Sequence, residues 1–260
     1  MADNIPPLNI GIVSTRLAGT DGVSLEVQKW VAALEHLGHR CFFFTGESDW
    51  PPDRTMLVEQ AHFNHPTIQA ISCDLFDDYK RSTTTSGEVQ RLRYLLKQKL
   101  EVFLRRFNIQ LLIAENALAI PMNIPLGLAL TELVAETRIP TIGHPHDFSW
   151  ERSRFSVNSA QDYLQAAFPP RLPAVKHVVI NSFAASQLAL RTGLNASLIP
   201  NVMDFDNPPA ENSGRTDSLR ESLGISPDTR VLLQPTRIVP RKRIELAIEL
   251  IRRMNCDPCI

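Results

Sequence analysis

Short apolar runs alternate with helical patterns along most of the chain, and this alternation constrains the fold more than any other feature. It is typical of a parallel β-sheet with helices on its faces, because parallel neighbours need a crossover connection and are usually buried on both sides. The sequence therefore predicts an α/β fold with a doubly wound parallel sheet. The expected strands are residues 8–13, 41–45, 111–114, 141–144, 178–180 and 197–199, with a marginal edge strand at 67–71.

Helical periodicity fills the segments between these runs. Apolar residues recur at steps of four and three from Val23 to Leu37, and Gly38 then ends the predicted helix. Shorter helices are expected at 124–136, 159–168 and 183–191. The longest predicted helix, 86–107, has an apolar stripe of Val89, Leu92, Leu96, Leu100, Phe103 and Phe107.

The other face of the helix predicted at 86–107 is basic. Such a face suits an anionic membrane surface, so the sequence leaves a peripheral membrane contact open. It equally suits the solvated side of a helix that packs on the sheet. The basic residues are Arg91, Arg93, Lys97, Lys99, Arg105 and Arg106.

Residues 200–218 are rich in Pro, Asn, Asp and Ser and lack apolar periodicity, which indicates a linker. We expect residues 1–205 to form one complete α/β domain. Beyond the linker, the apolar run 231–233 leads into a helical pattern at Ile244, and one strand with one helix cannot bury an apolar face alone. Residues 206–260 are therefore interpreted as the linker and the first strand–helix unit of an incomplete second domain.

Charge and hydropathy exclude several classes of protein. The formal net charge of −1 argues against a nucleic-acid binder that relies on bulk electrostatics. The first residues have neither the basic nor the apolar region of a secretion signal, and no apolar run approaches the roughly 20 residues of a membrane helix. We therefore expect a cytoplasmic protein.

Two polar segments follow predicted strands, where open α/β sheets bind ligands. In the turn around Asp21, Gly22 and Val23, glycine permits close approach to a ligand at a helix start, although a plain structural turn explains the pattern equally well. In the second segment, His146 can bind a hydroxyl or move a proton, and Asp147 can orient it. A metal shared with His144 and a purely structural loop are the other interpretations, and no third metal ligand is evident.

A third polar segment places two cations on the turn between the run 231–233 and the last helix. Arg237 and Lys242 would lie near the helix start, where free N–H groups and the helix dipole favour an anion. The segment therefore predicts a phosphate or diphosphate site.

In the order of these features the chain resembles the family 4 glycosyltransferases of the GT-B fold, in which two Rossmann-like domains face each other and the second binds most of the donor. The resemblance covers nearly the whole chain. It implies transfer of a sugar from a nucleotide-sugar donor to a glycan or small-molecule acceptor, with retention and without a metal or other cofactor. The motifs that carry it are Asp21-Gly22-Val23, His146-Asp147, Asn181-Ser182, Ile199-Pro200-Asn201-Val202-Met203-Asp204, Arg237 and Lys242.

The resemblance also implies roles for individual residues. Arg237 and Lys242 would hold the donor diphosphate and neutralise the charge that builds on the leaving group. His146 would lie near the transferred sugar, with Asp147 beside it as the second candidate catalytic residue. The loop at Gly22 would lie close to the phosphates or to the acceptor.

The sequence departs from the family pattern at three points. Arg243 and Val202 stand where the family commonly has glycine, and no Glu is followed by another Glu eight positions later, so the family's paired-glutamate motif is absent. These departures keep other functions open. One is a non-catalytic fragment or a module that binds a glycan or partner. Another is a metal-dependent hydrolase centred on His144 and His146.

Overall fold

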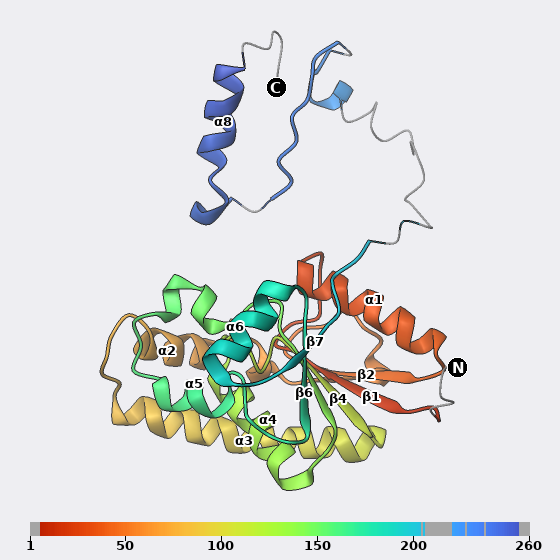
Figure 1. The fold of residues 1–260 in the computed structure, drawn as a ribbon, viewed down its shortest axis with the longest axis vertical. Coiled ribbons are helices and arrows are strands. Elements are labelled where there is room, and N and C mark those ends of the chain that lie inside the picture. The colour runs from red at the N-terminus through yellow and green to blue at the C-terminus, as the bar shows by residue number, and fades with distance from the viewer. Residues whose placement is uncertain (1–5, 204, 206–219, 227, 237, 255–260) are drawn as a thin grey trace. The chain divides into compact units, whose positions relative to one another are not determined.

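The computed structural model describes residues 6–203, 205, 220–226, 228–236 and 238–254. The chain divides into two compact units, Met1–Val202 and Met203–Ile260, and each is described by itself. Figure 1 shows the first unit as a sheet surrounded by helices. Within the described ranges, no helix combines the length and the apolar character needed to cross a bilayer.

Seven parallel strands form the sheet of the first unit, in the order β3-β2-β1-β4-β5-β6-β7. The strand order runs outward in both directions from the β1–β4 pair, so the sheet is doubly wound, as predicted. Ligands of such sheets bind beyond the carboxyl ends of the strands at this switch point. The bounds are β1 (Asn9–Val13), β2 (Arg40–Thr45), β3 (Thr55–Leu57), β4 (Leu111–Glu115), β5 (Thr141–His144), β6 (Val175–Val179) and β7 (Ala196–Leu198).

Helices cover both faces of this sheet (Figure 1). Helix α1 packs on one face against apolar side chains of β1, β2 and β4, while α3 and α4 pack on the other. Short 3-10 turns η1 to η4 complete the connections. The helical bounds are α1 (Gly22–His36), η1 (Pro52–Arg54), η2 (Glu59–Ala61), α2 (Pro66–Leu75), α3 (Thr83–Phe107), α4 (Ile124–Thr137), η3 (Ser149–Glu151), η4 (Ser153–Phe155), α5 (Gln161–Ala167) and α6 (Ser182–Thr192).

Helix α3 confirms the predicted apolar stripe residue for residue, because the six residues of the stripe are the buried residues of this helix. It packs closely on the sheet. A Cβ at Gly11 of β1 would lie 2.7 Å from the ring of Phe103, so only glycine fits under this helix.

Part of the basic face of α3 holds α3 to α4. The Lys97 ammonium lies 2.6 Å from Glu132 and 2.7 Å from Glu136, and Arg93 pairs with Glu132 as well. Two residues of the predicted basic face, Arg93 and Lys97, are therefore paired with carboxylates of the neighbouring helix. The membrane contact of this face stays a prediction.

The edge strand expected at 67–71 is wrong, because this segment belongs to helix α2. Pro66 occupies the first turn, the His65 side chain accepts a hydrogen bond from the Thr67 N–H, and Ile68, Ile71 and Leu75 are buried on one side at helical spacing. The edge of the sheet is instead β3, inside the segment expected to be a loop, and it pairs in parallel with β2.

The second unit contains the short turn η5 (Pro240–Lys242) and helix α8 (Ile244–Arg253). The strand expected at 231–233 does not form, and its three side chains are exposed. A strand is stabilised by hydrogen bonds to its neighbours, and the described residues of this unit include no neighbouring strand. The predicted linker lies largely outside the described residues.

Candidate active site

The carboxyl ends of β4 and β5 bring a carboxylate and two imidazoles together. Glu115 is the last residue of β4 and lies opposite His144, the last residue of β5, in the sheet register. The ring of His144 is fully buried, the Glu115 side chain is 1% exposed, and His146, just beyond the strand, is 13% exposed. Of these three side chains, His146 is the one most exposed to solvent.

Glu115 contacts both histidines. Its Oε1 lies 2.6 Å from Nε2 of His146, and its Oε2 lies 3.0 Å from Nδ1 of His144. Burial alone raises the pKa of Glu115, but the hydrogen bonds from the two imidazoles outweigh burial, so the net pKa of this carboxyl is lowered. Glu115 is therefore an ionised carboxylate that accepts hydrogen bonds from both rings.

The same three residues are the kinds of ligand that bind transition metals, and their ligand atoms lie within 4.8 Å of one another. Two ligands on a tetrahedral zinc ion, each about 2.0–2.1 Å from it, lie about 3.3 Å apart. The 2.6 Å separation between His146 Nε2 and Glu115 Oε1 is shorter, as expected for a charge-assisted hydrogen bond. Both histidines are hydrogen-bonded to Glu115 here, and Glu115 is the third candidate metal ligand that the sequence did not reveal.

Neighbouring residues fix the two histidines. Asn116 adopts a left-handed conformation, with φ of 57°, and its Oδ1 accepts a 2.8 Å hydrogen bond from the His146 N–H. The Trp30 ring of α1 lies against His144, with 4.5 Å between centroids. Backbone and rings are therefore both held in place before any ligand binds.

Asp147, the second predicted catalytic residue, is paired with Arg152 rather than with a histidine. The segment around it is also held: the Phe148 N–H donates to Glu151 at 2.6 Å, and the rings of Phe148 and Trp150 stack. Glu115, and not Asp147, is the carboxylate that contacts His146.

The predicted loop lies at the start of α1, directly after β1 and thus at the switch point of the sheet. Asp21 caps the helix, and its Oδ1 accepts hydrogen bonds from the N–H groups of Val23 and Ser24 at 3.0 and 3.3 Å. A Cβ added at Gly22 would meet no atom within 4 Å, so this position opens toward free space. The carboxylate already occupies two of the N–H groups that an anion would need.

Of the two predicted phosphate-binding cations, Arg237 lies outside the described residues. Lys242 ends η5 with an exposed side chain, and its carbonyl accepts a 3.2 Å hydrogen bond from the Gln234 amide. Arg243 has a φ of 50°, in the left-handed region that glycine adopts most easily. The glycine that the family commonly has at this position therefore has a conformational reason.

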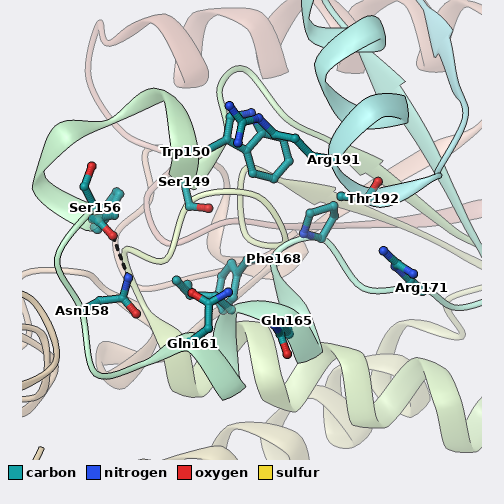
Figure 2. Close-up of a pocket in the computed structure, with 13 residues that line it drawn as sticks. Ser149, Trp150, Ser156, Asn158, Gln161, Gln165, Phe168, Arg171, Arg191 and Thr192 are labelled. Atoms are coloured by element: carbon teal, nitrogen blue, oxygen red, sulfur yellow. Dashed lines mark hydrogen bonds between the residues drawn. The ribbon is translucent and has the colours of Figure 1, made fainter. Parts of the chain in front are cut away.

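A groove of about 790 Å³ lies beside α5 and the C-terminal end of α6 (Figure 2). The Arg191 guanidinium lies over the Trp150 ring, 5.6 Å from its centroid. No carboxylate belongs to the lining, which mixes aromatic, amide and cationic side chains and so suits a polar ligand. The lining includes Trp150, Phe155, Asn158, Gln161, Gln165, Phe168, Arg171 and Arg191.

Sequence reasoning found His146 but missed its partners. The strand predicted at 111–114 stops one residue before Glu115, the carboxylate that contacts both histidines. One signal was available: a carboxylate directly after one buried strand and histidines directly after another meet if these strands are neighbours.

Comparison with known proteins finds relatives along nearly the whole chain. No family model matches the chain. It is 32% identical over 252 residues to mannosylglucosylglycerate synthase of Thermotoga maritima, which covers 94% of the chain and 56% of that protein. It is 30% identical over 265 residues to the enzyme of the same name from Petrotoga mobilis, covering 96% and 58%. The chain thus spans little more than half the length of these relatives.

Solved structures agree on the fold. A glycosyltransferase from Rickettsia africae superposes with a TM-score of 0.60 at 11% identity, covering 96% of this chain and 58% of that one. The chain therefore has the GT-B fold. Sucrose-phosphate synthase from Thermosynechococcus elongatus gives a TM-score of 0.59 at 13% identity, with coverages of 95% and 60%. At such identities the likeness shows the GT-B fold, which the sequence predicted.

Proposed function

We propose that the chain provides the acceptor-side domain and the beginning of the donor-binding domain of a glycosyltransferase. The enzyme would move a sugar from a nucleotide sugar to a small acceptor, with retention and without a metal. The observation that carries this proposal is the His146–Glu115 pair at the carboxyl edge of a GT-B domain. The relationship to the two synthases supports it. The cytoplasmic location expected from the sequence belongs to the same proposal.

The name of the relatives suggests the class of acceptor. It describes a product built from mannose, glucose and glycerate, so a small glycoside that carries a carboxylate is the acceptor we propose for this chain. Mannose is then the sugar to be transferred. Both choices rest on the relatives and are open to direct assay.

The loop at Asp21 belongs to the acceptor side in this proposal. A phosphate at the start of α1 would face the Asp21 carboxylate, which already accepts from two N–H groups there. A hydroxyl can donate to that carboxylate, whereas a phosphate is repelled by it. The arrangement therefore supports acceptor recognition more than phosphate binding at this loop.

Arg237 and Lys242 take the donor diphosphate in this proposal. Fixed cations stabilise the negative charge that grows on a diphosphate as its bond to the sugar breaks, which removes the need for a metal ion. The exposure of the Lys242 side chain leaves it accessible to such a ligand.

Sugar transfer tests the proposal. The enzyme assayed is a chimera that joins this chain to the part of the Thermotoga maritima synthase that it does not match. We expect it to transfer mannose from a uridine, guanosine or adenosine diphosphomannose to glucosylglycerate, with the donor's anomeric configuration in the product and the same rate in EDTA. Absence of transfer from all three donors by a folded chimera contradicts the proposal.

The groove beside α5 favours a second candidate function, binding of a glycan without turnover. Trp150 lines the groove under the Arg191 guanidinium, and the amides and arginines of the lining can bind hydroxyl and carboxylate groups. Calorimetry with glucosylglycerate and the 260-residue chain tests this function. Binding that is lost in Trp150→Ala but kept in His146→Ala favours the binding module, and the opposite pattern favours the transferase site.

A further inference from the structure

We propose that Glu115 is a positioning residue that sets the tautomer of His146, so that the Nδ1 atom of His146 accepts a hydrogen bond from a hydroxyl of the sugar substrate. The inference rests on the proposed function for the identity of the ligand. The tautomer itself is a property of this chain and can be measured without any sugar.

The tautomer follows from the chemistry of the cluster. An ionised carboxylate only accepts hydrogen bonds, and a neutral imidazole has a single N–H. Because Glu115 contacts Nε2 of His146 and Nδ1 of His144, each of these nitrogens must carry the proton of its ring. The Nδ1 of His146 is then left with a lone pair, which makes it an acceptor.

The burial of the cluster also argues for a function. Removing a carboxylate from water is costly, and an apolar residue would fill the same space with less penalty. His144 adds to this penalty, since its buried Nε2 has no hydrogen-bond partner among the described residues. Moving a proton to this Nε2 would therefore bury an N–H that has no acceptor among the described residues.

The substitution Glu115→Gln replaces one carboxylate oxygen with an NH2 group, so that one histidine nitrogen faces a hydrogen-bond donor in place of an acceptor. A carboxamide has one accepting oxygen and one donating NH2 group, so only one of the two histidines can still donate to it. If His144 accepted from the amide, its proton would move to the buried Nε2, which has no partner. His146, which is partly exposed, can place its proton on Nδ1 at less cost. We therefore expect His146 to change tautomer.

Nitrogen-15 NMR of the imidazole rings tests this expectation on the 260-residue chain. In the wild type we expect the His146 proton on Nε2, and in Glu115→Gln on Nδ1. Glu115→Asp retains the carboxylate and should retain the wild-type tautomer. The matched control is Glu132→Gln, which removes the charge of a carboxylate held by Arg93 and Lys97 on the helices and should leave His146 unchanged.

Either of two spectra overturns the proposal: a wild-type His146 with its proton on Nδ1, or a folded Glu115→Gln chain whose His146 keeps its proton on Nε2. The wild-type spectrum decides the first point even if the variant does not fold.

Kinetics of the chimera test the consequence for the substrate. A misoriented or wrongly protonated imidazole reduces turnover strongly, so Glu115→Gln should lower kcat/KM about 100-fold, with partial recovery in Glu115→Asp and no loss in Glu132→Gln. An unchanged kcat/KM in Glu115→Gln contradicts the role in substrate binding. Lack of sugar transfer by the wild-type chimera contradicts the proposed function instead, and leaves the NMR result as a separate test of the tautomer.

Discussion

The two units of the chain use similar apolar patterns with opposite results. In the first unit, the stripe of α3 is buried against the sheet and neighbouring helices, and Leu96 is fully inaccessible. In the second, Leu246, Ile248 and Leu250 of α8 are 49%, 54% and 58% exposed, and the helix has no buried residue. A periodic pattern thus specifies a helix locally, but its stabilisation depends on a neighbouring layer.

The same contrast applies to the candidate functional residues. His146 is held by Glu115 and Asn116 within a packed domain, so its geometry exists before a ligand binds. Lys242 is exposed at the end of a short turn, and no described residue forms an ion pair with it. The first unit thus contains a histidine held by its neighbours, whereas the second contains an exposed cation.

The largest expected difference between the two units is in stability. Leu96→Ala removes a fully buried side chain from the interface of α3 with the sheet and should lower the free energy of unfolding by about 2–5 kcal/mol. Leu250→Ala, the matched change in α8, should alter it by less than about 0.5 kcal/mol. Urea unfolding of both variants measures this difference, and equal losses would show that the units do not differ in packing.

Lys242→Ala should remove most of the transfer activity of the chimera. Loss of one preorganised charge contact to the leaving diphosphate typically lowers kcat on the order of a hundredfold. Arg253→Ala is the control, because Arg253 is an exposed cation of the same unit that pairs with Glu249. Unchanged kinetics for Lys242→Ala would remove this residue from the donor site.

The acid sensitivity of the first unit should decrease in His177→Gln. Burial lowers the pKa of His177, partly offset by a hydrogen bond with the Pro170 backbone. The unfolded chain therefore binds a proton below about pH 6.5 that the folded chain does not, so stability is lost as pH falls from there toward the folded pKa. Each unit of difference between the two pKa values corresponds to about 1.4 kcal/mol. Thermal unfolding between pH 7 and 5 should show a flatter profile for the variant, and an identical profile contradicts this role of His177.

The smallest effect is expected from Arg243→Gly in the chimera. Arg243 holds a left-handed conformation that is strained for a residue with a side chain. Relief of this strain, less the greater flexibility of glycine in the unfolded state, should raise the free energy of unfolding by about 0.5–1 kcal/mol. A decrease would mean that contacts of the arginine side chain outweigh the backbone strain.

Much of the first unit could be predicted from sequence, because its periodic patterns are long. The boundaries of β5 and the six buried residues of α3 agree with the predictions, and the helix predicted at 183–191 forms as α6, which Gly193 caps with a φ of 73°. The segment 67–71 forms a helix and not the predicted strand, because five residues with apolar side chains at 68, 70 and 71 fit either structure. The strand predicted at 231–233 is absent for a different reason, because strand formation depends on partner strands that the local sequence does not specify.

The candidate site was predictable in part. His146 and Asp147 were recognised from the density of polar residues after a strand. The contact between Glu115 and His146 depends on the pairing of β4 with β5 and on their register, neither of which one sequence reveals. The pairing of Asp147 with Arg152 likewise depends on the fold of a loop between the two.

Transfer by the His146→Ala chimera tests most directly whether the carboxyl edge of the first unit acts in sugar transfer. We would measure initial rates with a diphosphomannose and glucosylglycerate, and binding of the nucleotide diphosphate by calorimetry. Together these distinguish an effect on sugar transfer from an effect on donor binding. We predict a large loss of kcat/KM with nucleotide binding retained. Equal losses in transfer and nucleotide binding, or a transfer rate equal to that of the wild type, would contradict a substrate-binding role for His146.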